Sequence, residues 1–171
     1  MELVDLIDDE GRTIGVVPRH EMRARRLPHR STYVLVFDHG GRLFVHLRTA
    51  TKDVYPGHWD VTIGGVTAAG ESFAEGVRRE IREELGIEAD AEELFPFRYA
   101  DPAVIVHGMV YRLVHDGPFR LQAEEIVRGE FLTWTQVKDL IARERFCPDG
   151  LQVLAEYERR FGTPAAVPED G

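Results

Sequence analysis

The segment that most constrains the fold runs from residue 65 to residue 87 and reads GVTAAGESFAEGVRREIREELGI. Its apolar residues recur every four positions, which indicates one buried face of a helix over Ser72–Leu85. These apolar residues are Phe73, Val77, Ile81 and Leu85. Ser72 with Glu75 three residues later is typical of a capping box, and Gly86 is typical of a helix end. The sequence therefore predicts a helix with defined ends that packs one face against a core.

A second face of this helix carries three carboxylates at positions i, i+3 and i+4. They belong to Glu80, Glu83 and Glu84. Carboxylates this close repel one another, and a hard divalent cation such as Mg²⁺ relieves the repulsion while bridging to substrate phosphates. Arg79 precedes Glu83 by four residues and can pair with it, and the adjacent Gly64-Gly65 turn leaves room for backbone beside a cation. Charged runs on helices are usually solvated faces, so this prediction depends on the whole segment.

The complete segment fits one long pattern with no substitution: glycine, five residues, glutamate, seven residues, then Arg-Glu-apolar-any-Glu-Glu-any-Gly-apolar. This pattern is the signature of the Nudix superfamily, which the chain resembles. A chance match in a chain of this length has odds on the order of 10⁻⁷ at average residue frequencies. The resemblance implies an α+β fold, an αβα sandwich with a mixed central β-sheet. It also implies an Mg²⁺-dependent pyrophosphohydrolase in which Mn²⁺ can replace Mg²⁺.

The resemblance further implies roles for single residues. The expected metal ligands are Glu80, Glu84, Glu83 (directly or through water) and the carbonyl of Gly64. Glu71 is expected to orient the site from the start of the helix, and Gly65 is expected to support the site from the glycine turn. The expected catalytic group comprises Glu83, Glu84, Arg79 and a general base from a loop outside the segment. For that base we select Glu125, with Glu124 as the second candidate. The competing interpretation is that both are exposed loop acids without a catalytic role.

The resemblance extends to a particular branch of the superfamily. The stretch LPHRSTYVLVFDHGGRLFVHLRTATKDVYPGHWD is similar to type 1 isopentenyl-diphosphate isomerases and to isomerase-like, YfcD-like Nudix hydrolases, and HDGPFRLQAEE and FCPDGL are similar to the second group. Arg48 and Lys52 match the diphosphate-binding pair of the isomerases. Isomerase chemistry is not expected, because Gly64 and Val66 replace its cysteine and histidine, and Met22 replaces another histidine.

The remaining sequence predicts one domain over residues 1–162, with residues 1–30 as an N-terminal β-hairpin extension and 163–171 as a disordered tail. The expected strands are Leu3–Ile7, Thr13–Val17, Ser31–Asp38, Arg42–Arg48, Asp60–Ile63, Val104–Val114 and Phe131–Thr133. The expected helices are Ser72–Leu85, Thr135–Arg145 and Leu151–Phe161, with a break at Pro148-Asp149-Gly150. A basic stretch, Arg19–Arg30, is expected to hold a short helical turn.

Composition limits the partners. The net charge of −9 argues against general binding of nucleic acid or of an anionic membrane, both of which need a basic surface. No apolar run approaches the roughly 20 residues that span a bilayer. A single cysteine, Cys147, permits no intrachain disulfide and is expected to be a small buried residue, so the expected location is the cytoplasm.

Together these features predict hydrolysis of a small nucleotide, a nucleoside di- or triphosphate, to the nucleoside monophosphate plus phosphate or pyrophosphate. Three alternatives stay open: hydrolysis of an ADP-sugar or another nucleoside diphosphate derivative, isopentenyl-diphosphate isomerisation, and a nucleotide-binding module without catalysis. His29 is the one histidine expected to border the site. The sequence indicates no oligomeric state.

Overall fold

A computed structural model of the chain describes residues 1–164. Its strands are β1 (Leu3–Ile7), β2 (Thr13–Pro18), β3 (His29–Phe37), β4 (Leu43–Arg48), β5 (Trp59–Asp60), β6 (Glu92–Ala100), β7 (Ile105–Val114) and β8 (Ile126–Leu132). Its helices are α1 (Arg19–Ala24), α2 (Phe73–Glu80), the π-helical turn η1 (Ile81–Leu85), α3 (Trp134–Arg143) and α4 (Pro148–Phe161). Within these residues no helix has the length and apolar character needed to cross a membrane. The tail expected to be disordered lies, from residue 165 on, outside the described residues.

The central sheet is mixed, as expected. Its strand order is β5-β4-β3-β7-β6, with β8 paired to β4. β3 and β7 run parallel over nine residue pairs, from His29↔Val106 to Phe37↔Val114, and the other pairs are antiparallel. β3 and β4 form a hairpin only at its turn, because the strands pair at Phe37↔Leu43 and then diverge to different partners.

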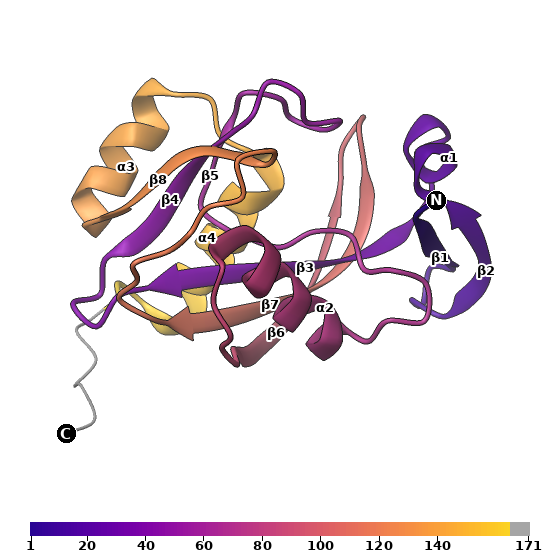
Figure 1. Cartoon of the computed structure of the whole chain (residues 1–171), viewed down its shortest axis with the longest axis horizontal. Coiled ribbons are helices and arrows are strands. Elements are labelled where there is room, and N and C mark those ends of the chain that lie inside the picture. Colours follow the sequence, from indigo (N-terminus) through magenta and orange to yellow (C-terminus); the bar gives the residue numbers. More distant parts are fainter. Residues whose placement is uncertain (165–171) are drawn as a thin grey trace.

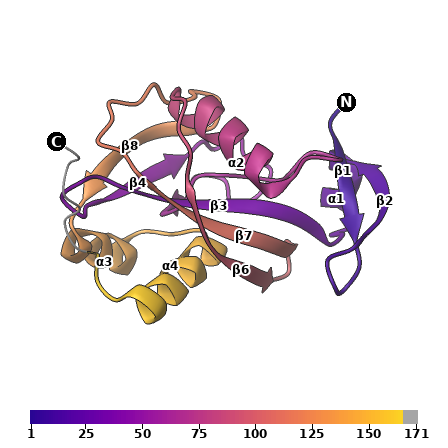
Figure 2. The same ribbon diagram turned by 90° about the horizontal axis from the view of Figure 1, so that it is seen from below.

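Helices cover both faces of this sheet, which gives the αβα sandwich (Figure 1 and Figure 2). Alternate residues of β3 face opposite layers. Val34 and Val36 pack with α2 and η1, whereas Leu35 and Phe37 pack in the larger core that includes α3 and α4. The sheet therefore holds the α2–η1 helix rigidly against one face.

The N-terminal hairpin β1–β2 forms a separate two-stranded sheet at one end of the molecule (Figure 1). A small core of Val4, Met22 and Val66 joins it and α1 to the loop that precedes α2. The backbone amide of Ala69 also donates to the carbonyl of Leu3 at 2.9 Å. These contacts hold the extension beside the start of the 65–87 segment.

Three local differences from the sequence predictions have physical causes. β6 was not predicted, although Phe95, Phe97 and Tyr99 alternate inward along it. It contains Pro96, which an edge strand such as β6 tolerates. α4 begins at Pro148, where a break was expected, because proline suits the first turn of a helix.

The third difference is in the predicted helix Ser72–Leu85. Its start is as expected, since Ser72 and Glu75 form the reciprocal capping box. Its last turn widens into η1 and ends at Gly86, whose φ is 70°. The backbone amides of Arg120 and Gln122 donate to the carbonyls of Leu85 and Glu84 at 3.0 and 3.1 Å. A distant loop thus satisfies the carbonyls that the helix end leaves free.

Candidate active site

Two of the three predicted carboxylates are buried together at the junction of α2 and η1. Glu80 and Glu84 are each 8% exposed, while the side chain of Glu83 is 44% exposed and stands at the rim. Behind them the apolar stripe is buried as predicted, with Val77, Ile81 and Leu85 at 2% exposure or less. The packing of that stripe therefore fixes the direction in which Glu80 and Glu84 point.

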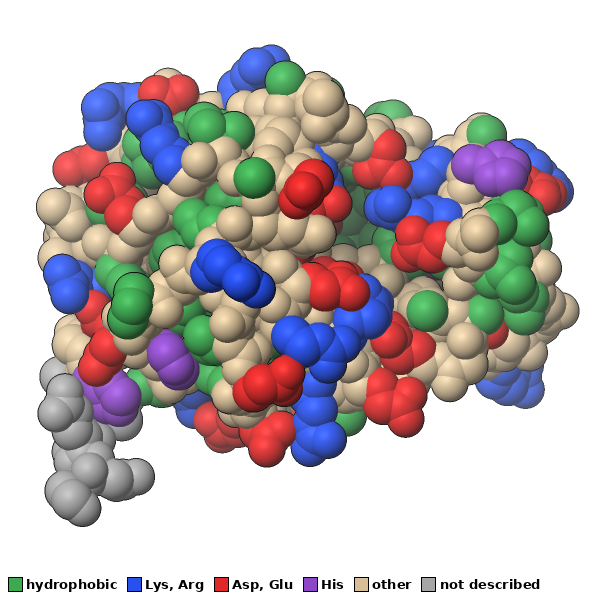
Figure 3. All heavy atoms as spheres, viewed as in Figure 1, with side chains coloured by type: hydrophobic (Ala, Val, Ile, Leu, Met, Phe, Trp, Pro, Cys, Tyr) green, Lys and Arg blue, Asp and Glu red, His purple; other side chains and the backbone are tan. Residues whose placement is uncertain are grey.

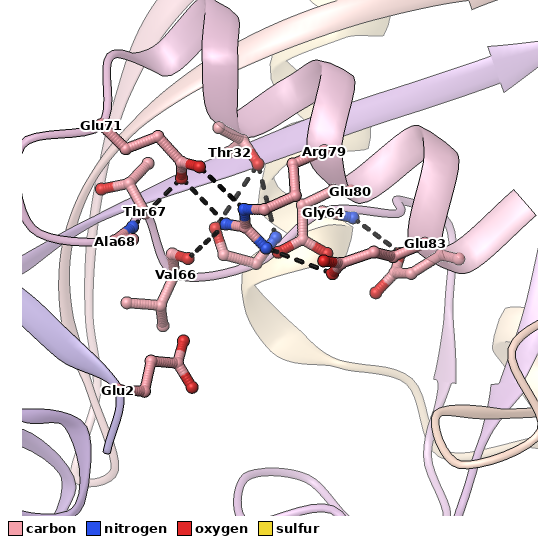
Figure 4. Close-up of polar contacts among 12 residues, drawn as sticks. Glu2, Thr32, Gly64, Val66, Thr67, Ala68, Glu71, Arg79, Glu80 and Glu83 are labelled. Carbon is pink, nitrogen blue, oxygen red and sulfur yellow. Dashed lines mark hydrogen bonds and ion pairs between the residues drawn. The ribbon is translucent and has the colours of Figure 1, made fainter. Parts of the chain in front are cut away.

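Arg79 is the centre of a polar network around these carboxylates (Figure 4). Its guanidinium donates two hydrogen bonds to Glu71, at 2.8 and 2.9 Å, and others to Glu80 at 3.0 Å and Glu83 at 3.3 Å. A further bond reaches the carbonyl of Val66 at 3.3 Å. The expected Arg79–Glu83 pair is thus present, but Glu71 is the main partner that orients Arg79. Glu71 also accepts from the amide of Ala68 at 3.1 Å, so it connects the loop to the helix.

The electrostatic environment of the buried pair favours a cation. Burial raises the pKa of Glu80 to about 7, although Arg79 acts in the opposite direction. Burial, followed by the charge of Glu80, also raises the pKa of Glu84. Two carboxylates that are difficult to ionise together are stabilised by a nearby positive charge.

The predicted glycine turn has a steric requirement that the structure makes explicit. Gly64 has a φ of 127°, and a Cβ there would lie 2.2 Å from the carbonyl oxygen of Thr32. A Cβ on Gly65 would lie 2.9 Å from Oε1 of Glu80. The Gly64 amide donates to Oε2 of Glu84 at 3.1 Å. The turn therefore packs directly against both carboxylates. Only glycine fits at position 64, and a side chain at position 65 would displace the carboxylate of Glu80.

The donor set fits a hard divalent cation. Carboxylate and carbonyl oxygens are the ligands that Mg²⁺ prefers, and Glu80, Glu84 and the Gly64–Gly65 turn line one polar pocket. Within residues 1–164, however, no three acidic, histidine or cysteine side chains are already arranged as a metal site. Arg79 holds Glu80, and the Gly64 amide holds Glu84. A bound cation would have to draw these carboxylates away from their present partners.

Glu125, the predicted general base, lies across the same pocket at the end of the loop before β8. Its carboxylate contacts the ammonium group of Lys52. Glu124, the second candidate, is exposed and does not line the pocket. Gln122, which we did not single out, does line it. The structure thus brings Lys52 and Glu125, 73 residues apart, to the carboxylate site.

A second hollow, of roughly 600 Å³ including the space open to solvent, adjoins the carboxylate pocket and shares Lys52 with it. Arg48 lies in its wall, where its guanidinium donates to the carbonyls of Val54 at 2.8 Å and Tyr55 at 3.4 Å. We name this hollow the basic cleft, because four cationic side chains line it. They are Arg19, Arg23, Arg48 and Lys52.

Several residues of the basic cleft were not predicted as site residues. Arg19 and Arg23 come from α1, inside the basic stretch that the sequence does mark. Elsewhere in the cleft, the buried Asp60 lies near the half-buried Asp149, and the hydroxyl of Tyr33 donates to Asp149 at 3.0 Å. Burial, together with the charge of Asp149, raises the pKa of Asp60 to about 7. No sequence pattern distinguishes these acids, because their proximity arises only in the folded chain.

Two further expectations concern the cleft. His29 lines it and is 1% exposed, and burial lowers its pKa to about 4. Cys147 is 1% exposed, and burial raises the pKa of its thiol. Both residues are therefore in neutral form near pH 7, and Cys147 is buried as predicted.

Comparison with known proteins identifies the family of the chain. The NUDIX domain model matches residues 27–157. An uncharacterized Nudix hydrolase of Pseudomonas aeruginosa is 40% identical over 157 residues, which cover 91% of this chain and 93% of that protein. The uncharacterized Nudix hydrolase YfcD of Escherichia coli K12 is 39% identical over 168 residues, covering 97% and 92%. The crystal structure of DR0079 from Deinococcus radiodurans has a TM-score of 0.77 and 28% identity, covering 93% of this chain and 98% of that one.

Proposed function

Because this chain belongs to the Nudix family and is a pyrophosphohydrolase, we propose that it hydrolyses nucleoside di- or triphosphates with the aid of Mg²⁺. The products are the nucleoside monophosphate and phosphate or pyrophosphate. The observation that carries the proposal is the position of the buried Glu80–Glu84 pair, in a polar pocket that opens beside the basic cleft. Carboxylates suit a divalent cation, and the adjoining cationic side chains suit phosphate oxygens.

In this proposal each side chain has a separate task. Glu80, Glu84, Glu83 and the carbonyl of Gly64 would hold the cation. When bound, Mg²⁺ neutralises phosphate charge and lowers the pKa of a coordinated water. Arg79, oriented by Glu71, keeps Glu80 and Glu83 in position.

Glu125 would accept a proton from the attacking water while the oxygen of that water bonds to phosphorus. The bond from phosphorus to the bridging oxygen then breaks, and the leaving phosphate takes the electron pair. Lys52, which contacts Glu125, would stand between this base and the phosphates of the substrate. Arg48, in the cleft wall, would bind phosphate oxygens of the substrate together with Lys52.

The test is release of phosphate and pyrophosphate from nucleoside di- and triphosphates, ADP-sugars and isopentenyl diphosphate, with Mg²⁺, with Mn²⁺ and with a chelator. We expect metal-dependent release from the simple nucleotides, and a loss of at least about a hundredfold in kcat for Glu84→Gln. Glu88→Gln, an exposed acid beyond the helix, is the matched control and should retain activity.

Other outcomes would redirect the proposal. Preferred turnover of ADP-sugars would replace the substrate class but retain the catalytic site. Tight nucleotide binding without any turnover by folded protein would favour a binding module, and conversion of isopentenyl diphosphate to its isomer would contradict the hydrolase.

A further inference from the structure

The N-terminal extension contributes cationic side chains to the rim of the active site. α1 places Arg19 and Arg23 in the basic cleft, and Arg19 also lines the carboxylate pocket. In the space-filling view, basic side chains gather at the hollow between the sandwich and the N-terminal end (Figure 3). Among residues 1–164, only Arg19, Lys52 and the Gly64–Val66 turn line both hollows. Arg19 is therefore at the boundary that a substrate would cross.

The positive charge of these two arginines is compensated mainly by one shared carboxylate. Arg23 donates a hydrogen bond to Oδ2 of Asp53 at 3.2 Å, and Arg19 forms an ion pair with the same oxygen at 3.3 Å. The other carboxylate near Arg19 is that of Glu2, at 3.9 Å. Nε of Arg19 is buried and has no hydrogen-bond partner among the described residues. A buried donor of this kind is costly unless a further acceptor satisfies it.

The surroundings make this positive charge effective. The side chains of Arg19, Arg23 and Lys52 are 32%, 20% and 16% exposed, so solvent screens them less than ordinary surface cations. Burial lowers the pKa of Arg23, and the neighbouring Arg19 and Arg48 act in the same direction. A dianionic group entering here would gain charge-assisted hydrogen bonds from Arg19 and Arg23, which now share the carboxylate of Asp53.

We propose that Arg19 and Arg23 of the N-terminal extension, together with Lys52, form a subsite for the terminal phosphate of the substrate. The inference rests on the proposed function and makes it more specific. When a nucleoside di- or triphosphate is cut to the monophosphate, the part that leaves ends in a free phosphate. In an ADP-sugar the phosphate beyond the cut bond is esterified by the uncharged sugar and carries less negative charge. The subsite therefore favours substrates that end in a phosphate over those capped by a sugar.

The test compares ADP with ADP-ribose, and UDP with UDP-glucose, for wild type, Arg19→Gln and Arg23→Gln. We expect each variant to lose about tenfold in kcat/KM for the diphosphates, mainly through KM, and less than about twofold for the sugar derivatives. Arg25→Gln is the matched control, because Arg25 follows the same helix but lines neither hollow. It should behave as wild type, and Arg19→Lys should recover part of the loss.

A reciprocal variant separates a binding role from a structural one. Asp53→Asn removes the carboxylate that Arg19 and Arg23 share. A phosphate subsite predicts tighter binding of inorganic pyrophosphate, measured by calorimetry without turnover, whereas Arg19→Gln should weaken it about tenfold. If these arginines only hold the extension, Asp53→Asn would weaken binding or leave it unchanged.

The two proposals fail in different ways. If wild type hydrolyses none of the nucleotides, the proposed function is wrong. The subsite is then tested by pyrophosphate binding alone. If wild type is active but the arginine variants affect both substrate types equally, or neither, the subsite is wrong and the hydrolase stands. Absence of pyrophosphate binding by wild type would also overturn the subsite.

Discussion

At the scale of single residues, the carboxylates proposed to bind metal reduce the stability of the folded protein. Glu80 and Glu84 are both buried, and the charge of Glu80 raises the cost of ionising Glu84. Arg79 compensates Glu80 but is itself held mainly by Glu71. Stability near this pair is therefore lower than it would be with neutral side chains, and a cation should restore it.

A stability measurement on Glu84→Gln tests this balance. In the presence of a chelator, we expect the variant to melt about 2–4 °C above wild type, because a buried charge is removed while the amide oxygen can still accept from Gly64. Mg²⁺ should raise the melting temperature of wild type but not that of Glu84→Gln. Glu88→Gln should follow wild type, and an Mg²⁺ shift that survives in Glu84→Gln would contradict the proposed ligand.

His46 makes the protein sensitive to acid. It is 4% exposed, its Nδ1 has no partner among the described residues, and burial lowers its pKa to about 3, with Arg48 and Lys52 adding to the effect. In the unfolded chain histidine binds its proton near pH 6.5. Protonation therefore favours the unfolded chain below pH 6.5. The free energy of unfolding is at its full value above pH 6.5 and falls progressively as the pH drops toward 3.

We expect the free energy of unfolding of wild type to fall by about 2 kcal/mol between pH 7 and pH 5 because of His46 alone. Urea titrations of His46→Leu should show a shallower decline over this range. The exposed His20→Leu should decline as wild type does. Identical slopes for wild type and His46→Leu would show that another group controls the acid response.

At the scale of elements, the π-helical turn η1 is where the site and the fold meet. It contains Glu83 and Glu84, and its free carbonyls accept hydrogen bonds from the loop at Arg120 and Gln122. Gly86 allows this loop to approach. A Cβ on Gly86 would lie 2.9 Å from Cβ and 3.0 Å from the carbonyl oxygen of Arg120. The end of the helix is thus determined by a segment more than thirty residues away.

Gly86→Ala should therefore lower the free energy of unfolding by more than alanine usually does at a left-handed backbone position. Gly70→Ala is a matched control, since Gly70 has a similar φ of 76° but no atom within 4 Å of its would-be Cβ. We expect a loss of about 1 kcal/mol for Gly70→Ala and about 2–4 kcal/mol for Gly86→Ala in urea unfolding. Equal losses for the two variants would mean that the loop at Arg120 moves aside without lowering the free energy of unfolding.

At the scale of the whole molecule, the N-terminal extension is joined to the sandwich through a small core of its own. Val4, Met22 and Val66 form this core, separate from the two large ones on either side of the sheet. Arg30 adds a hydrogen bond to Asp5 at 2.8 Å. A unit with few buried apolar contacts opens more readily than the main body. The extension should behave as the least stable cooperative part of the fold.

Hydrogen exchange on Met22→Ala measures this directly. Removing a fully buried methionine costs about 2–5 kcal/mol, and here the loss should fall on residues 3–24. We expect their amides to exchange faster, while those of β3 and β7 keep wild-type protection. Faster exchange throughout the sheet would show instead that the extension and the sandwich unfold together.

Short-range features of the sequence determined the helix and its chemistry. The capping box, the apolar stripe and the spacing of the glutamates all lie within 23 residues, and local backbone geometry decides how such patterns fold. The mixed sheet and the family followed from the same segment. Period-two alternation in β6 was also present in the sequence, but Pro96 concealed a strand that only an edge position permits.

Only the tertiary structure decided which residues surround that chemistry. Lys52 meets Glu125, Asp60 meets Asp149, and Arg19 reaches the carboxylate pocket, each across a long stretch of chain. Such neighbours leave no period or motif in the sequence, because they are set by strand order and by the docking of the extension. The chain's sequence therefore specifies the helix that carries out the proposed cut, and its packing specifies what the cleft beside it can hold.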